Sequence, residues 1–370
     1  MATLYIHIPF CKQICSYCDF YRVGAVSLID DVIANSHVEL EQRKEYIANK
    51  PLTSIYFGGG TPSLVAPHEI EQIVDHARRL FDCTHLTEIT IEANPDDLND
   101  DYVTQLAQTS VNRVSLGIQS FDDEALQLMN RRHNAHEAEE AVARLKRAGI
   151  DNISIDLIFG IAGYGGKSLE ESLQRAIALG VGHISAYHLT IEPNTRLGLM
   201  TRRGEYTPIA EELSEREFQR VHNVLTAAGY EHYEVSNFAL KGCRAQHNSA
   251  YWTGVEYLGI GAGAHSFDGK SRTWCVSTAK EYANGIFRYE GEVLTRRDHL
   301  NEYVMTSLRR IEGIDLAYIA ECFGEGELQR IEQASKRWLT EGVLTRHGSN
   351  LAIPAEKFLI SDAVIESLFD

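Results

Sequence analysis

The stretch that decides the fold lies close to the N-terminus, where the apolar run Leu4-Tyr-Ile-His-Ile8 leads into Pro-Phe-Cys11-Lys-Gln-Ile-Cys15-Ser-Tyr-Cys18. The apolar run is typical of a strand, and the proline and phenylalanine that follow it end the strand. Three cysteines then stand at a C-x3-C-x2-C spacing. The sequence therefore predicts a strand that opens into a short thiolate-rich loop, and the function depends on what this loop binds.

Closely spaced cysteines have three common uses. A disulfide framework is disfavoured, because the chain has 370 residues and only seven cysteines, an odd and sparse count. Zinc is the main alternative, since His7 is near and Cys3His sites exist, but no second paired knuckle follows downstream. An iron–sulfur cluster is favoured. A [4Fe–4S] cluster normally takes four thiolates, so three in one loop leave an iron that can bind a small molecule.

The spacing of Cys11, Cys15 and Cys18, with Tyr17 directly before the last cysteine, resembles the signature of radical S-adenosylmethionine (SAM) proteins. In that family the open iron chelates the methionine end of SAM, and an electron from the cluster cleaves the sulfonium to release a 5′-deoxyadenosyl radical. The resemblance implies that the three cysteines hold a [4Fe–4S] cluster with SAM beside it. The protein then positions these groups and excludes water and oxygen, while the cofactor carries the hard chemistry.

Length and composition set further bounds. The length suits one large α/β domain plus a smaller one, and 44% hydrophobic residues is ordinary for a globular protein. No long apolar segment and no signal-peptide pattern is evident, so we expect a cytoplasmic protein without a membrane span. The net charge of −17 argues against nucleic-acid binding. Local basic clusters still allow contact with an anionic ligand or with a membrane surface.

Strand-like runs alternate with helical stretches along the first two thirds of the chain. This alternation predicts a parallel sheet with crossover helices. Polar residues and glycines gather at the carboxyl ends of the strands, as they do on barrel scaffolds. Together with the resemblance, the pattern predicts an α/β fold with a partial (β/α)6 barrel. The expected strands are residues 4–8, 53–57, 88–95, 113–119, 153–159 and 183–190, and the expected helices include about 28–49, 67–81, 168–179 and 210–228.

We expect three parts along the chain. Residues 1–237 form the radical SAM core domain, and the glycine-rich residues 238–290 form an irregular linker with site loops. Residues 291–370 are helical and then contain two short apolar runs around His347-Gly-Ser-Asn350, a pattern typical of a β-hairpin. This combination predicts a small winged-helix-like α+β domain. Such domains often bind DNA, but the acidic balance of the chain favours a structural or partner role.

Several residues at the ends of the expected strands match SAM-contacting positions of the radical SAM family. The run Gly58-Gly-Gly-Thr61 resembles the glycine motif, where the backbone approaches the methionine amino group, although such a run alone is more often a tight turn. Asp156 is an acid within an apolar run, which is costly unless it is paired. Arg131 can neutralise a carboxylate, with Arg132 as the alternative. The resemblance implies SAM contacts at Tyr5, Gly59, Gly60, Thr61, Glu92, Gln119, Arg131, Asp156 and Tyr187.

The resemblance can be narrowed to one family within the radical SAM proteins. Four segments resemble the oxygen-independent coproporphyrinogen III oxidase family over nearly the whole chain: 7–11, 58–63, 156–160 and 261–266. The oxidase itself carries a further cysteine two residues after the third, where this chain has Phe20. Asp19-Phe20 instead resembles the heme chaperone branch of the family.

The segment His247-Asn248-Ser-Ala-Tyr251-Trp252 matches H-N-x-x-Y-W, a motif that the resemblance ties to heme binding in that branch. A histidine imidazole is a common axial ligand of heme iron, and tyrosine and tryptophan offer flat apolar surface to a porphyrin. Taken alone, the hexapeptide is more typical of ordinary packing. Further candidates are His265 and Cys243 as a second axial ligand and Lys241 and Arg244 as partners of the propionates, whereas Cys83, Cys275 and Cys322 are expected to be core thiols.

The sequence therefore predicts a heme chaperone on a radical SAM scaffold. Such a protein binds heme and transfers it to an acceptor hemoprotein, here expected to belong to the respiratory chain. This is a binding and transfer function, with no catalytic residues and no coproporphyrinogen oxidase activity expected. The alternative is an oxygen-independent coproporphyrinogen III oxidase, which forms protoporphyrinogen IX by oxidative decarboxylation. A radical SAM protein with an unrelated substrate is the third hypothesis.

Overall fold

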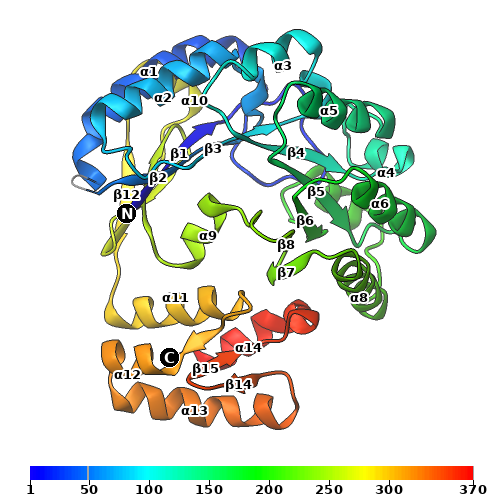
Figure 1. The fold of residues 1–370 in the computed structure, drawn as a ribbon, viewed down its shortest axis with the longest axis vertical. Coiled ribbons are helices and arrows are strands. Elements are labelled where there is room, and N and C mark those ends of the chain that lie inside the picture. The colour runs from blue at the N-terminus through cyan, green and yellow to red at the C-terminus, as the bar shows by residue number, and fades with distance from the viewer. Residues whose placement is uncertain (48–49, 370) are drawn as a thin grey trace.

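The computed structural model describes residues 1–47 and 50–369, so the expected helix end at 48–49 lies outside the described residues. Six neighbouring parallel strands form the centre of a twelve-stranded sheet, which confirms the predicted (β/α)6 arrangement. Figure 1 shows this sheet curved like an open barrel, with helices around its outer side. The six strands are β1 (Ala2–Ile8), β2 (Leu52–Gly59), β3 (Glu88–Ala93), β4 (Arg113–Gln119), β5 (Ile153–Phe159) and β6 (His183–His188).

The outer helices bury one apolar face each. In α2 (Pro67–Leu80) the buried residues Ile70, Ile73, Val74 and Ala77 recur at the helical spacing of three and four, so they form one stripe. Pro67 opens this helix at its first turn, where a missing backbone N–H costs nothing. The other helices of this layer are α1 (Ile29–Arg43), α3 (Asp100–Leu106), α4 (Asp123–Leu128), α5 (Ala135–Arg147), α6 (Lys167–Ala178) and α8 (Glu211–Ala227). The short α7 (Arg196–Arg202) lies instead against the cysteine loop, where the Leu197 amide donates to the Ser16 carbonyl oxygen at 2.7 Å.

The two faces of the central strands differ in chemistry. In β1, Leu4, Ile6 and Ile8 are fully buried members of the main core. Alternate residues of a strand point to the opposite face, and there β1 carries Tyr5 and His7. The corresponding positions of the neighbouring strands are also polar, as with Tyr56 of β2, whose ring stacks on that of Tyr5 at 6.1 Å. The interior of the barrel is therefore polar, and this polar interior connects to the candidate site.

The expectation of an irregular linker at residues 238–290 is wrong at the level of local structure. The strand β9 in this segment pairs in parallel with β1, and three further strands extend the sheet beyond it. These strands have at most five residues and are separated by glycine turns such as Gly261, so they show little alternation in sequence. The elements are β8 (Asn237–Ala239), α9 (Gln246–Trp252), β9 (Glu256–Ile260), β10 (His265–Phe267), β11 (Ser271–Cys275), α10 (Ala279–Ala283) and β12 (Tyr289–Val293).

The C-terminal part is a small α+β domain, as predicted. Its hairpin pairs β14 (Thr345–His347) with β15 (Asn350–Ala352), and Gly348 adopts positive φ in the turn between them. Figure 1 shows this part, in orange and red, below the barrel and joined to it through the segment between β12 and α11. Its remaining elements are α11 (Arg296–Leu308), β13 (Ile314–Asp315), α12 (Leu316–Phe323), α13 (Glu325–Thr340) and α14 (Ser361–Leu368). None of the helices in the described residues has the length and apolarity needed to cross a bilayer.

Candidate functional site

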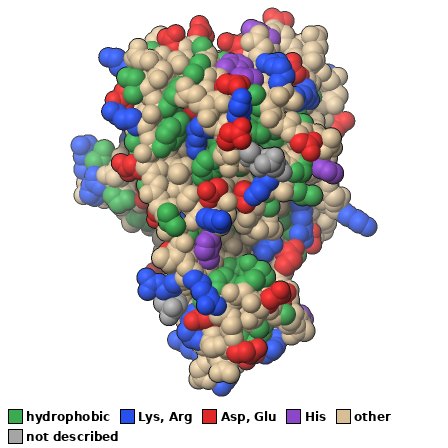
Figure 2. Space-filling view, turned by 90° about the vertical axis from the view of Figure 1, so that its left-hand side faces the viewer, with side chains coloured by type: hydrophobic (Ala, Val, Ile, Leu, Met, Phe, Trp, Pro, Cys, Tyr) green, Lys and Arg blue, Asp and Glu red, His purple; other side chains and the backbone are tan. Residues whose placement is uncertain are grey.

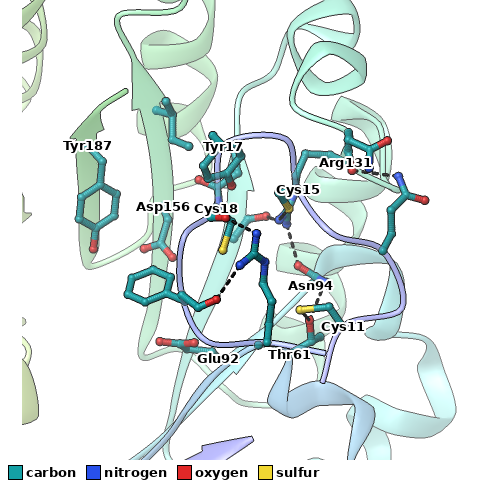
Figure 3. A pocket seen from close by; sticks show the side chains of 18 of the residues that line it. Cys11, Cys15, Tyr17, Cys18, Thr61, Glu92, Asn94, Arg131, Asp156 and Tyr187 are labelled. Atoms are coloured by element: carbon teal, nitrogen blue, oxygen red, sulfur yellow. Dashed lines mark hydrogen bonds between the residues drawn. The ribbon is translucent and has the colours of Figure 1, made fainter. Parts of the chain in front are cut away.

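A cavity of about 460 Å³ opens at the carboxyl ends of the parallel strands. Figure 3 shows the three cysteine side chains on their loop beside this cavity, with Glu92, Asp156 and Tyr187 on the adjacent strands. The structure brings eight of the nine predicted SAM-contact residues to this cavity, namely Gly59, Gly60, Thr61, Glu92, Gln119, Arg131, Asp156 and Tyr187. The ninth, Tyr5, lies one layer below, where its ring would touch a Cβ built on Gly58.

The cysteine loop is held in place by contacts with distant segments. The Ser16 hydroxyl donates to the Leu128 carbonyl oxygen at 2.9 Å, and the Cys11 amide donates to the Val23 carbonyl oxygen at 3.1 Å. All seven cysteines are free thiols. These anchors fix the loop against other elements of the barrel, so the three sulfurs are presented to the cavity by a preorganised backbone.

Hydrogen-bond donors and cations surround the three sulfurs. Thr61 Oγ1 donates to Cys11 Sγ at 3.5 Å, and Arg131 Nη1 donates to Cys15 Sγ at 3.2 Å. The guanidinium of Arg22 donates to the carbonyl oxygen of Cys18. Such donors stabilise negative charge on sulfur, whether in a free thiolate or in a metal-bound one.

Metal binding by these thiols is coupled to the loss of their protons. Burial raises the pKa of Cys11 and of Cys18, and the positive charges of Arg22 and Arg131 counteract part of this rise for Cys11. These two thiols therefore carry protons in the metal-free protein and release them on metal binding.

The surroundings of the three thiols fit a [4Fe–4S] cluster. In such a cluster each cysteine binds a different iron. The cysteine loop supplies three thiols, and the donors at Cys11 Sγ and Cys15 Sγ can stabilise the negative charge of a bound cluster.

Two half-buried carboxyl groups face the same cavity from β3 and β5. Glu92 accepts hydrogen bonds from the Tyr56 hydroxyl at 2.8 Å and from the Gly59 amide at 3.2 Å. Burial raises the pKa of Glu92 to about 7 and also raises the pKa of Asp156. A cationic ligand in this cavity would favour the ionised form of both groups, so the site is suited to bind positive charge.

Arg131, and not Arg132, is the arginine available to a ligand. Arg132 is ion-paired with Asp96 at 2.7 Å and Asp97 at 3.2 Å. Arg131 donates through Nη2 to Asn94 Oδ1 at 2.7 Å and to the Gly117 carbonyl oxygen at 2.6 Å. Its Nε is buried and has no partner within the described part of the chain. Within the described residues Arg131 forms no ion pair with a carboxylate, so its positive charge, unlike that of Arg132, remains available to an anionic group.

Sequence reasoning missed two residues of this cavity and the strain at a third. Asn94 and Arg22 line the cavity, and the only sequence signal for Asn94 is that it directly follows a strand end. Gln119 was predicted, but its backbone has φ of 70°, and the pairing of β4 with β5 shifts register at this point. A non-glycine residue with positive φ is uncommon and is concentrated at functional sites.

The heme-type motif lies at the other end of the barrel, on α9. The amides of Gln246 and His247 both donate at 2.9 Å to the carboxylate of Glu88, the first residue of β3. The His247 ring is 1% exposed and stacks on Tyr56 at 4.8 Å. Its Nδ1 is hydrogen-bonded to Ser54 Oγ at 2.8 Å. The short helix therefore closes the amino ends of the strands with His247 pointing into the barrel.

The two halves of the motif have different surroundings. His247 Nε2 is hydrogen-bonded to the Tyr251 hydroxyl at 3.2 Å, so both ring nitrogens of the histidine are occupied. Burial, with the nearby positive charge of Arg113, lowers the pKa of His247 to about 3, and the ring is neutral. Tyr251 and Trp252 instead line a second cavity of about 880 Å³, which separates α9 and β9 from the C-terminal domain. Asn248 is half-buried between the two halves.

The other sequence-based heme candidates are scattered. His265 is exposed and stacks on Trp274 at 5.7 Å, and Arg244 is ion-paired with Glu231 at 2.9 Å and Glu312 at 2.8 Å. Within the described chain, the second cavity is lined by none of His265, Cys243, Lys241 and Arg244.

Of the three expected core thiols, Cys275 is buried and Cys83 is half-buried, but Cys322 is exposed. The expectation for Cys322 is therefore wrong, because this residue stands near the end of the short helix α12 on its solvent side.

Comparison with known proteins agrees with this geometry. The Radical SAM superfamily model matches residues 5–176, and the HemN C-terminal domain model matches residues 294–358. "Heme chaperone HemW" of Mycobacterium tuberculosis is 32% identical over 99% of this chain and 94% of its own length. The Escherichia coli protein of the same name is 34% identical over 94% of both chains. The solved structure of coproporphyrinogen III oxidase (HemN) from Escherichia coli covers 100% of this chain and 90% of its own, with a TM-score of 0.84 at 21% identity, which shows the fold. The chain therefore belongs to the heme chaperone HemW family of radical SAM proteins.

Proposed function

We propose that this chain is a heme chaperone, which binds heme and transfers it to acceptor hemoproteins. The observation that carries the proposal is the similarity of most of the chain to relatives named heme chaperone HemW, at 32% to 35% identity. Phe20 supports it, because this residue stands on the rim of the cysteine cavity at the position where the oxidase has its further cysteine, and a phenyl ring cannot replace a thiol. The predicted acceptors are hemoproteins of the respiratory chain, and the predicted place of action is the cytoplasm.

In this proposal Cys11, Cys15 and Cys18 hold a [4Fe–4S] cluster. The cluster supplies one-electron chemistry to the SAM that is bound beside it. Thr61 and Arg131 donate hydrogen bonds to two of the cysteine sulfurs, and such bonds tune the charge and the potential of a bound cluster.

The same cavity offers complementary groups to each end of the methionine part of SAM. The carboxyl groups of Glu92 and Asp156 match its ammonium group, and the positive charge of the Arg131 guanidinium matches its carboxylate. Gly60 lets the glycine segment pack directly against the backbone that leads into the cysteine loop, because a Cβ there would lie 2.6 Å from the Phe10 carbonyl oxygen. Gln119 and Tyr187 complete the wall, and Tyr5 supports the glycine segment from below.

Heme binds, in this proposal, on the α9 side of the barrel. Tyr251 and Trp252 present their rings to the second cavity, while His247 and the Glu88 carboxylate hold α9 against the strands. For His247 to serve as the axial ligand that the motif predicts, the Tyr251 hydroxyl must first leave His247 Nε2. The proposal thus places cluster and heme at opposite ends of one barrel.

The test combines two assays on one anaerobically reconstituted sample of the full chain. The first is heme titration followed by absorbance, with subsequent transfer to an apo-cytochrome of the b type. The second is turnover of coproporphyrinogen III with SAM and a reductant. We expect one heme per chain, its transfer to the acceptor, and no protoporphyrinogen. Rapid decarboxylation of coproporphyrinogen III, or the absence of heme binding, would contradict the proposal.

A further inference from the structure

We propose that the cavity between α9 and the C-terminal domain is the heme site, with His299 as the iron ligand and Arg296 and Arg310 as partners of the propionates. This inference rests on the proposed function, since it states where and by which groups the heme is bound. In this inference the heme iron is bound by His299, which lines the cavity, and not by His247, which is buried.

The cavity has the size and the walls that a flat tetrapyrrole needs. Its volume of about 880 Å³ lies within the range of roughly 300–1,000 Å³ that is usual for cofactor sites. One wall comes from the barrel, where the rings of Tyr251 and Tyr257 meet edge to face at 4.8 Å. The opposite wall comes from the C-terminal domain, where the rings of Tyr303 and Tyr318 lie 4.5 Å apart. Two aromatic walls on separate domains can enclose a planar apolar ligand between them.

His299 is the histidine that lines this cavity. It stands near the start of α11 and is half-buried, and no hydrogen bond of its imidazole is found among the described residues. His247 differs in every respect, because it is buried and both its ring nitrogens are hydrogen-bonded. Iron binds an imidazole nitrogen that is free of other partners, so His299 can bind iron without first giving up a hydrogen bond.

The charge around the cavity matches two carboxylates. Three arginines line it, and the one carboxylate among the lining residues, Glu302, is already ion-paired with Arg272 at 2.6 Å. Arg310 makes only a long ion pair through Nη1 with Glu312 at 4.0 Å, and its buried Nε has no partner among the described residues. Arg296 makes a long contact of 3.4 Å to the Cys322 carbonyl oxygen. Two guanidinium groups with unused donors suit the two propionates of heme, because guanidinium binds carboxylate through paired N–H groups.

The surface where the C-terminal part joins the barrel carries both basic and apolar side chains. Figure 2 shows Lys and Arg side chains and hydrophobic side chains next to each other where the narrow C-terminal part joins the wider barrel. In a chain with a net charge of −17, a cavity lined by three arginines and one paired glutamate is a local exception. It would attract an anionic ligand.

His247 then acts as a positioning residue. Its hydrogen bond to the Tyr251 hydroxyl orients the ring of Tyr251, which is part of the cavity wall. Loss of His247 would loosen this wall and weaken heme binding, but the axial ligand of the iron and its absorbance and EPR signatures would remain.

The experiment is a heme titration of the full chain, followed by absorbance and by EPR of the ferric complex. His299→Ala is expected to lower heme affinity at least tenfold, and His299→Cys to give the spectrum of a thiolate-bound heme. His347→Ala is the matched control, because this exposed histidine lies in the same domain on β14 and does not line the cavity. It should leave both affinity and spectrum unchanged. Combined Arg296→Glu and Arg310→Glu substitutions should weaken binding at least tenfold without changing the spectrum.

The outcomes separate this inference from the proposed function. If the His299 variants keep the affinity and the spectrum of the unmutated chain, while His247→Ala loses both, the cavity assignment is wrong and the heme chaperone proposal stands. If the unmutated chain does not bind heme at all, both are overturned. A thiolate spectrum in His299→Cys confirms the ligand even if the overall affinity has fallen.

Discussion

The cavity at the carboxyl ends of β1–β6 and the cavity below α9 are assembled in opposite ways. The first takes its side chains from one short loop and from successive strand ends, and it is rich in sulfur and buried charge. The second joins residues 251–272 of the barrel side to residues 296–323 of the C-terminal domain, and it is rich in aromatic rings and arginine. A parallel sheet brings strand ends together by topology, so the first cavity can be read from motifs. The second arises only when two domains pack.

Cys15→Ser tests whether the two cavities bind their ligands independently, and it has the largest expected effect. We expect nearly complete loss of iron and sulfide, because two thiolates in one loop cannot retain a [4Fe–4S] cluster. Heme binding at the opposite end should change less than twofold. Iron and sulfide analysis and heme titration of the same anaerobic preparation measure both. Cys322→Ser is the control, since this thiol is exposed and outside the cysteine cavity. A joint loss of cluster and heme would mean that the two cavities are not independent.

His247→Ala tests whether this residue holds α9 against the barrel. It leaves the hydroxyls of Ser54 and Tyr251 without a partner and opens a space beside Tyr56. The free energy of unfolding should fall by about 2–4 kcal/mol, the usual cost of a buried cavity with lost hydrogen bonds. Urea denaturation of the cofactor-free chain measures the change, with His347→Ala as an exposed control. An unchanged urea midpoint would show that His247 has no packing role.

Gly60→Ala addresses the cysteine cavity with a smaller effect. The new Cβ would lie 2.6 Å from the Phe10 carbonyl oxygen, so the backbone next to the cysteine loop must shift. Overpacking of this kind costs about 1–3 kcal/mol, and SAM affinity should fall at least tenfold because the glycine segment and the cysteine loop are displaced from each other. Gly326→Ala in α13 is the control, because nothing lies within 4 Å of its Cβ position. Equal SAM affinity in both variants would remove the glycine segment from the site.

The pH dependence of Glu92 gives the smallest effect. Burial raises its pKa to about 7 in the folded chain, above the usual value of 4.5 that applies after unfolding. The folded state therefore holds this proton more tightly, so the stability that comes from it is complete below about pH 4.5 and is lost as the pH rises through about 7. Glu92→Gln keeps a neutral side chain at every pH.

Raising the pH from about 4.5 to about 8 should therefore destabilise the unmutated chain relative to Glu92→Gln. The difference in their free energies of unfolding should change by about 2 kcal/mol. The full shift is not expected, because Glu92 is partly exposed to the cavity. Urea midpoints of the cofactor-free proteins at both pH values give the measurement. A difference that is the same at both pH values would show that Glu92 titrates normally.

The sequence was sufficient for the first cavity because its chemistry is local. The cysteine loop, the glycines after β2 and the acids on β3 and β5 each stand at a recognisable place in a strand, and the fold then unites them. It was not sufficient for Asn94, whose role depends on a hydrogen bond from Arg131, far away in the chain. It was also not sufficient for Arg22, which donates to the Cys18 carbonyl oxygen only because the cysteine loop folds back on itself.

On the α9 side, the sequence was not sufficient to predict the surroundings of each residue. The motif at 247–252 was recognised as a unit, yet the structure turns His247 inward and Trp252 outward. One turn of helix separates faces that point to different surroundings, and no sequence pattern says which face meets which cavity. His299 could not be connected with the motif at all, because the contact between α9 and α11 is tertiary. For the same reason the short strands at 238–290 were taken for a linker, since their partners lie elsewhere in the chain.

The most direct test of two separate sites is a heme titration of the reconstituted chain that is already saturated with radiolabelled SAM. Bound heme and bound SAM are measured together after rapid gel filtration under anaerobic conditions. We predict one heme per chain with the SAM fully retained, because the two cavities lie at opposite ends of the barrel. Release of one SAM for each heme bound would contradict the account, since it would place heme in the cysteine cavity.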